Sequence, residues 1–176
     1  MVLSPFWRRL TLSVHIGASV GWLGGVAAFV ALGVIGLTHP DPATVRGAYL
    51  VMEPAAYLVL LPLAVASLVS GILSSLTSIW GLFRHYWVLF KLVINLVATL
   101  VLITYLDSFA AMARLAADPS TALTTLRNPS PLLHAVLAML VLSVAVVLAV
   151  FKPRGLTRWG LRKPAADPAA EPAADP

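Results

Sequence analysis

Four long apolar runs dominate the chain, and short polar segments rich in proline or arginine separate them. The runs cover residues 10–37, 55–82, 87–106 and 131–151. Each is long enough to cross a hydrocarbon core of about 30 Å as a helix that rises roughly 1.5 Å per residue. The pattern predicts an all-α fold, an integral membrane four-helix bundle.

The connections between these runs differ in length. The segment WGLFRHYW, residues 80–87, is short, so it predicts an antiparallel hairpin between the second and third helices, with aromatic residues at the membrane interface. Residues 38–54 and 107–130 are longer and contain prolines, which favour breaks between helices. We expect one transmembrane domain over residues 1–160 and a disordered Pro/Ala-rich tail over 161–176.

The first run is longer than the apolar region of a secretory signal peptide, which spans about 7–15 residues. We therefore expect it to stay in the mature protein as a membrane helix.

Composition supports a membrane protein and excludes several site chemistries. The chain is 60% hydrophobic and 11% charged, a balance that a soluble domain does not show. It has no cysteine, which excludes disulfides, cysteine-ligated zinc or iron–sulfur sites and covalently attached c-type haem. Lys and Arg outnumber Asp and Glu by 12 to 7, but the basic residues flank the apolar runs, so we expect no nucleic-acid partner.

The positions of the basic residues predict the orientation, because Lys and Arg resist translocation. With the N-terminus inside, the inner set is Arg8, Arg9, Arg84, Lys91, Lys152, Arg154, Arg158, Arg162 and Lys163, and the outer set is Arg46, Arg114 and Arg127. This asymmetry predicts a multi-pass protein of the plasma membrane with both termini in the cytoplasm.

Glycines in the first run lie four residues apart, at Gly17, Gly21 and Gly25. Such a stripe allows another helix to approach closely. The neighbouring helix belongs either to the same chain or to a second copy, in which case these glycines form the seam of a homodimer. The sequence leaves both interpretations open.

The first run also carries a histidine in an uncharged segment. At about 100° per residue, His15, Ser19 and Trp22 share one side of the helix, next to the glycine stripe. Lys91 begins another helix that runs in the same direction, so His15 and Lys91 are expected at similar depth and could line one pocket. The alternatives are an imidazole that hydrogen-bonds a neighbouring helix and a lysine that extends to the interface.

The other histidines lie near the membrane surfaces. His85 is in the inner hairpin, whereas His39 and His134 lie on the outer side, where they are candidates for a separate metal site. A helix about 30 Å long separates the two sides, so His15 and His134 cannot share one iron within a chain. No paired buried carboxylates and no hydrolase or nucleotide-binding motif are present, and no catalytic residue is predicted.

Two short patterns give a family resemblance. The first is His15-Ile16 followed by Trp22, Gly24 and Gly25; the second is Trp87 followed by Lys91-Leu92. Together they resemble the four-helix core of copper-resistance D-type membrane proteins and HemJ-type protoporphyrinogen oxidases. With the R-H-Y-W hairpin and the K-P-R-G segment at residues 152–155, residues 7–160 resemble an uncharacterised actinobacterial branch of that superfamily.

The resemblance implies haem b bound through His15, with a role for Lys91. We expect Trp22 and Ser19 beside the haem and Arg84, Lys91 or Arg9 at its propionates. A second axial ligand is not evident from the sequence, and His85 is the best candidate within the chain. The predicted function is electron transfer or haem-dependent oxidation, with an unknown redox partner. Two alternatives are transport of a metal ion such as copper, or resistance to it, through His39 and His134, and a structural module that dimerises through the glycine stripe.

Overall fold

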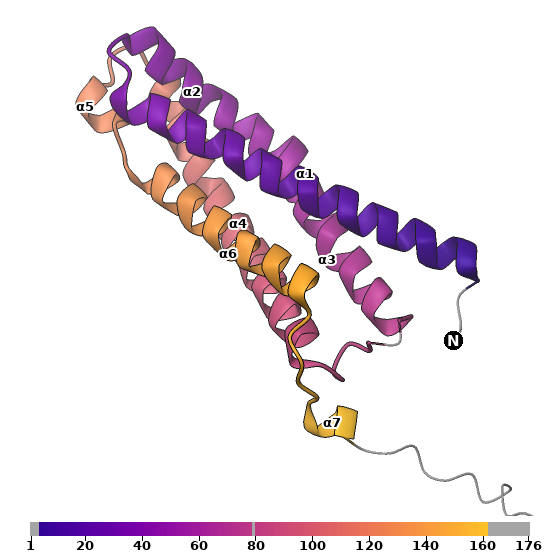
Figure 1. The fold of residues 1–176 in the computed structure, drawn as a ribbon. Coiled ribbons are helices and arrows are strands. Elements are labelled where there is room, and N and C mark those ends of the chain that lie inside the picture. The colour runs from indigo at the N-terminus through magenta and orange to yellow at the C-terminus, as the bar shows by residue number, and fades with distance from the viewer. Residues whose placement is uncertain (1–3, 79, 162–176) are drawn as a thin grey trace, which may run out of the picture.

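The computed structural model describes residues 4–78 and 80–161, which form a bundle of helices (Figure 1). The elements are α1 (Pro5–Thr38), α2 (Pro42–Ala55), the π-helix η1 (Ala56–Leu60), α3 (Leu61–Leu76), α4 (Tyr86–Ala117), α5 (Leu123–Leu126), α6 (Ser130–Phe151) and α7 (Arg158–Leu161). No β-strand occurs within this described part of the chain.

Four helical segments are long and apolar enough to cross a membrane: Pro5–Thr38, Pro42–Leu76, Tyr86–Ala117 and Leu123–Phe151. The prediction of an all-helical bundle with four apolar helices is therefore confirmed. The orientation of the termini stays a prediction.

In the bundle, α1 packs against α3 and α6, and α4 packs against α2, α3 and α6.

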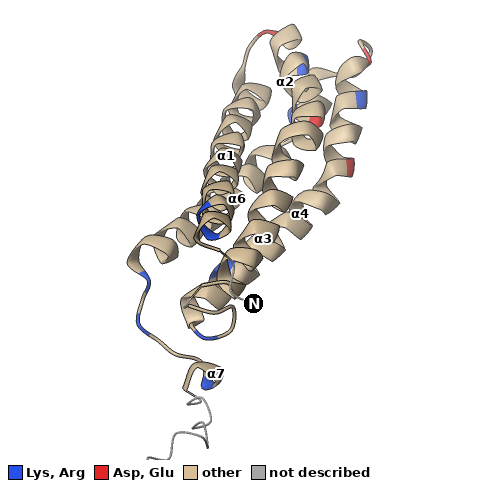
Figure 2. Cartoon of the chain, turned by 90° about the vertical axis from the view of Figure 1, so that its right-hand side faces the viewer, with Lys and Arg blue, Asp and Glu red and all other residues tan. Residues whose placement is uncertain are grey.

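We call the end that holds residues 77–85 the hairpin end. The end that holds residues 39–41 and 118–129 is the loop end. All the Asp and Glu residues in the described ranges lie in the half of the bundle nearer the loop end (Figure 2): Asp41, Glu53, Asp107 and Asp118.

The first loop-end connection is shorter than predicted, because most of residues 38–54 is helical. Asp41 caps α2: its carboxylate accepts hydrogen bonds from the backbone N–H groups of Ala43 and Thr44 and from the Thr44 hydroxyl. Pro54 lies inside α2 and cannot donate a backbone hydrogen bond, and the π-helical turn η1 follows it directly. The second span therefore runs over 42–76 instead of 55–82.

The second loop-end connection is also shorter than predicted, since α4 continues to Ala117 instead of ending at residue 106. The Arg46 guanidinium of α2 holds the chain beyond α4. It donates to the backbone carbonyls of Ala116, Asp118, Pro119 and Thr121 over 2.6–3.3 Å. One side chain thus fixes the turn where α4 ends.

We call the half of the bundle nearer the loop end the loop half, and the other half the hairpin half. Large apolar side chains fill the core of the loop half. Phe29 of α1 packs edge-on against Phe109 of α4, with the ring centroids 5.3 Å apart. Two glycines of α1 permit close approach in this half: a Cβ at Gly33 would lie 3.0 Å from the Cα of Leu132, and one at Gly36 would lie 2.8 Å from the Tyr49 ring. Helix α1 therefore lies close to α6 at Gly33 and close to α2 at Gly36.

The segment after α6 folds back over the hairpin. Thr157 donates its backbone N–H to the carbonyl of Arg84 over 3.0 Å, and its hydroxyl donates to the carbonyl of Phe83. His85 and Leu156 form an isolated antiparallel bridge. The predicted disordered tail lies outside the described residues from position 162 onward.

Candidate functional site

His15 lies at the contact between α1 and α3, with its ring held by the backbone of α3. Its Nδ1 is 3.0 Å from the carbonyl oxygen of Ser67 and 3.4 Å from the hydroxyl of Ser70. Because a carbonyl oxygen can only accept, Nδ1 carries the hydrogen. In the neutral ring Nε2 therefore keeps its lone pair, and the ring makes the hydrogen bond to a neighbouring helix that the sequence predicted as the alternative to a ligand role.

Ser67 connects three helices through its hydroxyl group. Its Oγ is 2.8 Å from the Ser19 hydroxyl of α1 and accepts a 3.0 Å hydrogen bond from Asn95 Nδ2 of α4. Ser67 is only 1% exposed. We call His15, Ser19, Ser67, Ser70 and Asn95 the polar seam.

Three buried polar atoms in the described residues have no hydrogen-bond partner: Ser74 Oγ, Trp87 Nε1 and Asn95 Oδ1. Asn95 belongs to the polar seam. Ser74 follows Ser70 by one turn of α3, and Trp87 precedes Asn95 by two turns of α4. Buried polar groups normally find a partner, so each of these three atoms has capacity for one further hydrogen bond.

Gly71 provides the space in which the His15 ring lies. A Cβ at this position would be 2.9 Å from His15 Cε1, closer than real contacts allow, and 3.2 Å from Nδ1. A larger residue at position 71 would therefore displace the imidazole from its carbonyl partner.

Lys91 lies on α4 one turn from both Trp87 and Asn95. Its ammonium is 5.6 Å from the centroid of the Trp87 ring. The polar seam thus contains His15 and Ser19, and Lys91 lies one turn from its member Asn95 on α4. A pocket shared by His15 and Lys91 stays a prediction.

The other residues predicted near this site belong to the hairpin. His85 donates from Nδ1 to the carbonyl of Trp80 over 2.7 Å, and its ring packs edge-on against the Trp80 ring. Its Nε2 therefore also keeps a lone pair. The side chain of Arg84 is exposed. A haem-ligand role for His85 and a propionate contact for Arg84 stay predictions.

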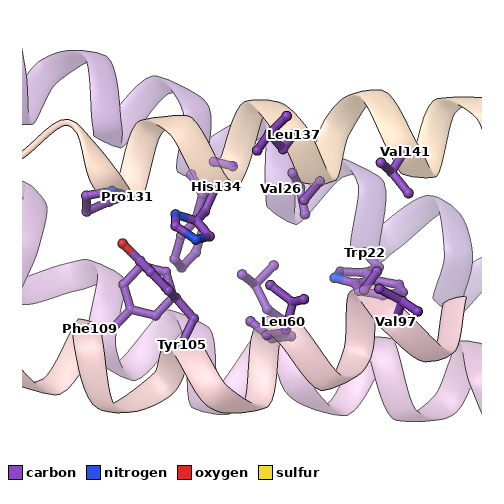
Figure 3. A pocket seen from close by; sticks show the side chains of 16 residues that line it. Trp22, Val26, Leu60, Val97, Tyr105, Phe109, Pro131, His134, Leu137 and Val141 are labelled. Atoms are coloured by element: carbon purple, nitrogen blue, oxygen red, sulfur yellow. The ribbon is translucent and has the colours of Figure 1, made fainter. Parts of the chain in front are cut away.

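A separate cavity of about 350 Å³ lies between α1, α4 and α6 in the loop half (Figure 3). Trp22 and His134 both line it. Figure 3 shows the His134 imidazole pointing into this cavity beside Tyr105, with Trp22 toward the opposite end. Trp22, which the sequence placed beside His15, thus borders this cavity.

Tyr105 was not predicted as a site residue. Its ring stacks on the imidazole of His134 with the centroids 4.2 Å apart. Tyr105 and Phe109 lie four residues apart on α4, a spacing that puts two aromatic rings on one side of the helix. That spacing was the signal in the sequence, but it did not identify His134 as the partner.

The two histidines predicted at the loop end make different contacts. His39 Nδ1 accepts a hydrogen bond from the backbone N–H of Asp41 over 3.2 Å, so its ring nitrogen stabilises the local turn. His134 uses Nδ1 to donate to the carbonyl of Ser130. Within residues 4–78 and 80–161, no group of three or more His, Asp or Glu residues could hold a metal ion.

The predicted glycine stripe faces two environments. A Cβ at Gly21 or Gly25 would meet Leu63 or Leu60, so these two glycines pack within the chain. A Cβ at Gly17 would meet no atom within 4 Å. A homodimer through this stripe stays a prediction.

Comparisons with models of known protein families, with curated proteins and with solved structures found no match to this chain. The resemblance to copper-resistance D-type and HemJ-type proteins therefore stays a prediction, and the function has to be argued from the site.

Proposed function

We propose that this chain is a multi-pass protein of the plasma membrane, with both termini in the cytoplasm, that binds haem b through His15 and functions in electron transfer or haem-dependent redox chemistry. The observation that carries the proposal is the hydrogen bond from His15 Nδ1 to the carbonyl of Ser67. It fixes the tautomer and the direction of the ring, as outer partners of metal-binding histidines do.

The residues around His15 fit a haem better than a bare metal ion. A haem needs one or two axial ligands from the protein, whereas a structural or transported metal ion needs a larger set of side-chain ligands. The polar seam offers one imidazole, small side chains and no carboxylate among its members. This donor set is smaller than a bare metal ion needs, and His39 and His134, the residues of the transport alternative, each make separate local contacts.

The chain's own residues would hold the group by three kinds of contact. His15 Nε2 would bind the iron, and the carbonyl of Ser67 would hold the ring through Nδ1. Lys91 supplies positive charge at the hairpin end, where a propionate carboxylate would be neutralised. The unpaired Trp87 Nε1 provides a hydrogen-bond donor in the same region. When bound, haem supplies one-electron exchange between ferric and ferrous iron.

Haem content tests the proposal. The full chain is purified in detergent from haem-replete cells, and the haem-to-protein ratio is measured for the wild type, His15→Ala and the control His39→Ala. We expect near-stoichiometric haem in the wild type and in the control, and loss of haem from His15→Ala. Haem-free wild-type protein, or equal haem in all three, would contradict the proposal.

A further inference from the structure

His134 is a preorganised hydrogen-bond acceptor in an otherwise apolar cavity. Its Nδ1 donates to the carbonyl of Ser130 over 2.9 Å, so the neutral ring keeps the lone pair on Nε2. Stacking on Tyr105 fixes the ring plane. Tyr105 is fixed in turn, since its hydroxyl is 2.8 Å from the hydroxyl of Ser130.

The polar contacts of His134 leave Nε2 available to a ligand. Both hydrogen bonds that connect this imidazole to the described part of the chain are made through Nδ1. Figure 3 shows the ring directed into the cavity, with the indole nitrogen of Trp22 facing the cavity from the other end. The cavity thus has an acceptor at one end and an N–H donor at the other, separated by apolar walls.

The cavity opens onto the surface that would face lipid. Four of its lining residues are also exposed on the outside of α4 and α6: Val97, Val101, Leu137 and Val141. A ligand can therefore enter sideways from the hydrocarbon, and an apolar tail can extend back between the two helices. At about 350 Å³, the cavity is at the small end of the range for ligand pockets, about 300–1,000 Å³.

We propose that this cavity binds the headgroup of a lipid-soluble quinol, whose hydroxyl donates a hydrogen bond to His134 Nε2. A quinol is flat and aromatic, carries oxygens at opposite ends of its ring and has an apolar tail, which are the features the cavity requires. A lipid acyl chain has no group for Nε2. This site is separate from the polar seam and does not depend on haem at His15.

Binding of a defined probe tests the proposal. The probe is a short-chain prenylated naphthoquinol, kept reduced without oxygen and added to the full-length protein in detergent. We expect saturable binding to the wild type and about tenfold or greater weakening in His134→Leu, because the quinol hydroxyl loses its acceptor. His39→Leu is the matched control, with the same chemical change outside the cavity, and should bind as the wild type does.

Two further variants keep the test decisive. His134→Gln places an amide oxygen near the position of Nε2, so it should restore much of the affinity. Ala138→Phe fills part of the cavity and should abolish binding. Equal affinity in the wild type and His134→Leu would overturn the proposal. So would a fatty-acid probe that displaces the quinol and binds the wild type and His134→Leu equally, because the cavity would then be an acyl-chain groove.

Discussion

His15 and His134 lie in opposite halves of the bundle, and their surroundings differ. His15 belongs to a seam of hydroxyl and amide groups that connects α1, α3 and α4, whereas His134 stacks on Tyr105 in a cavity with apolar walls. Both rings donate from Nδ1 to a backbone carbonyl. The same imidazole geometry thus occurs in polar and in apolar surroundings, and we propose a haem iron as the partner of the first ring and a hydrogen-bonding ligand as the partner of the second.

The halves also differ in how they are held together. In the hairpin half, side-chain hydrogen bonds connect α1, α3 and α4. The loop half has close helix contacts at Gly33 and Gly36 and the four carbonyl contacts of Arg46. Substitutions in the two halves should therefore lower the free energy of unfolding by different mechanisms.

The largest expected effect is at Arg46, which holds four backbone carbonyls at the loop end. Arg46→Met should lower the free energy of unfolding by about 2–4 kcal/mol, since hydrogen bonds from a charged group are among the strongest in proteins. Equilibrium unfolding in mixed detergent measures this. Arg127→Met, which removes a side chain bonded to one carbonyl, should cost less. An equal loss of unfolding free energy in Arg46→Met and Arg127→Met would show that Arg46 does not organise the loop end.

A methyl group at Gly33 tests the close contact of α1 with α6. Gly33→Ala should cost about 1–3 kcal/mol, because the new Cβ meets the backbone of Leu132 and this backbone cannot rotate away. Gly17→Ala is the matched control on the same helix, where a Cβ has open space, and should leave stability unchanged or slightly higher. The same unfolding assay measures both, and a destabilised control with an unaffected Gly33→Ala would reverse the expected order.

In the polar seam, the corresponding change is Ser67→Ala. It removes the partner of Asn95 Nδ2 and Ser19, and should cost about 1–2 kcal/mol. Ser143→Ala is the control, because the Ser143 hydroxyl bonds only to its own helix, at Met139. If both variants unfold alike, the seam does not hold the three helices together.

The smallest expected effect is the response of the loop end to acid. The Thr44 hydroxyl, with the backbone N–H groups of Thr44 and Ala43, holds the pKa of Asp41 below its ordinary value of 3.8. The Ser120 hydroxyl and backbone N–H likewise lower the pKa of Asp118. These carboxylates stabilise the fold fully above their unfolded pKa, and this contribution is lost as the pH falls through the lower folded pKa.

Unfolding midpoints between pH 6 and pH 3 test this response. The unfolding midpoint of the wild type should not change through these two groups near neutral pH, where both carboxylates are ionised. It should fall slightly below about pH 4. Asp41→Asn should keep the helix cap at neutral pH and show a smaller decline in acid. A decline that is identical in the variant would show that Asp41 does not contribute to it.

The sequence predicted the four spans because apolar runs of this length have few alternatives. It predicted the loop-end boundaries poorly, since prolines and charged residues were interpreted as breaks. Pro42 begins α2 at a position where its missing N–H is not needed, and Pro54 is accommodated next to a π-helical turn. Asp107 lies on a further stretch of α4 instead of ending the helix.

The candidate site was predicted only in part. His15 and Ser19 were identified because polar residues stand out in an apolar helix, and spacing put them on one side. Their partner Ser67 could not be found, because choosing among the serines of α3 requires the rotation of that helix against α1. The stacking of Tyr105 on His134 depends in the same way on the packing of α4 and α6.

The reduced-minus-oxidised absorption spectrum of the purified protein tests the central claim most directly, with His15→Ala and His134→Leu measured beside the wild type. The account predicts the Soret and α bands of b-type haem in the wild type, their loss in His15→Ala and their retention in His134→Leu. Wild-type protein without these bands, or bands that survive in His15→Ala and vanish in His134→Leu, would contradict it.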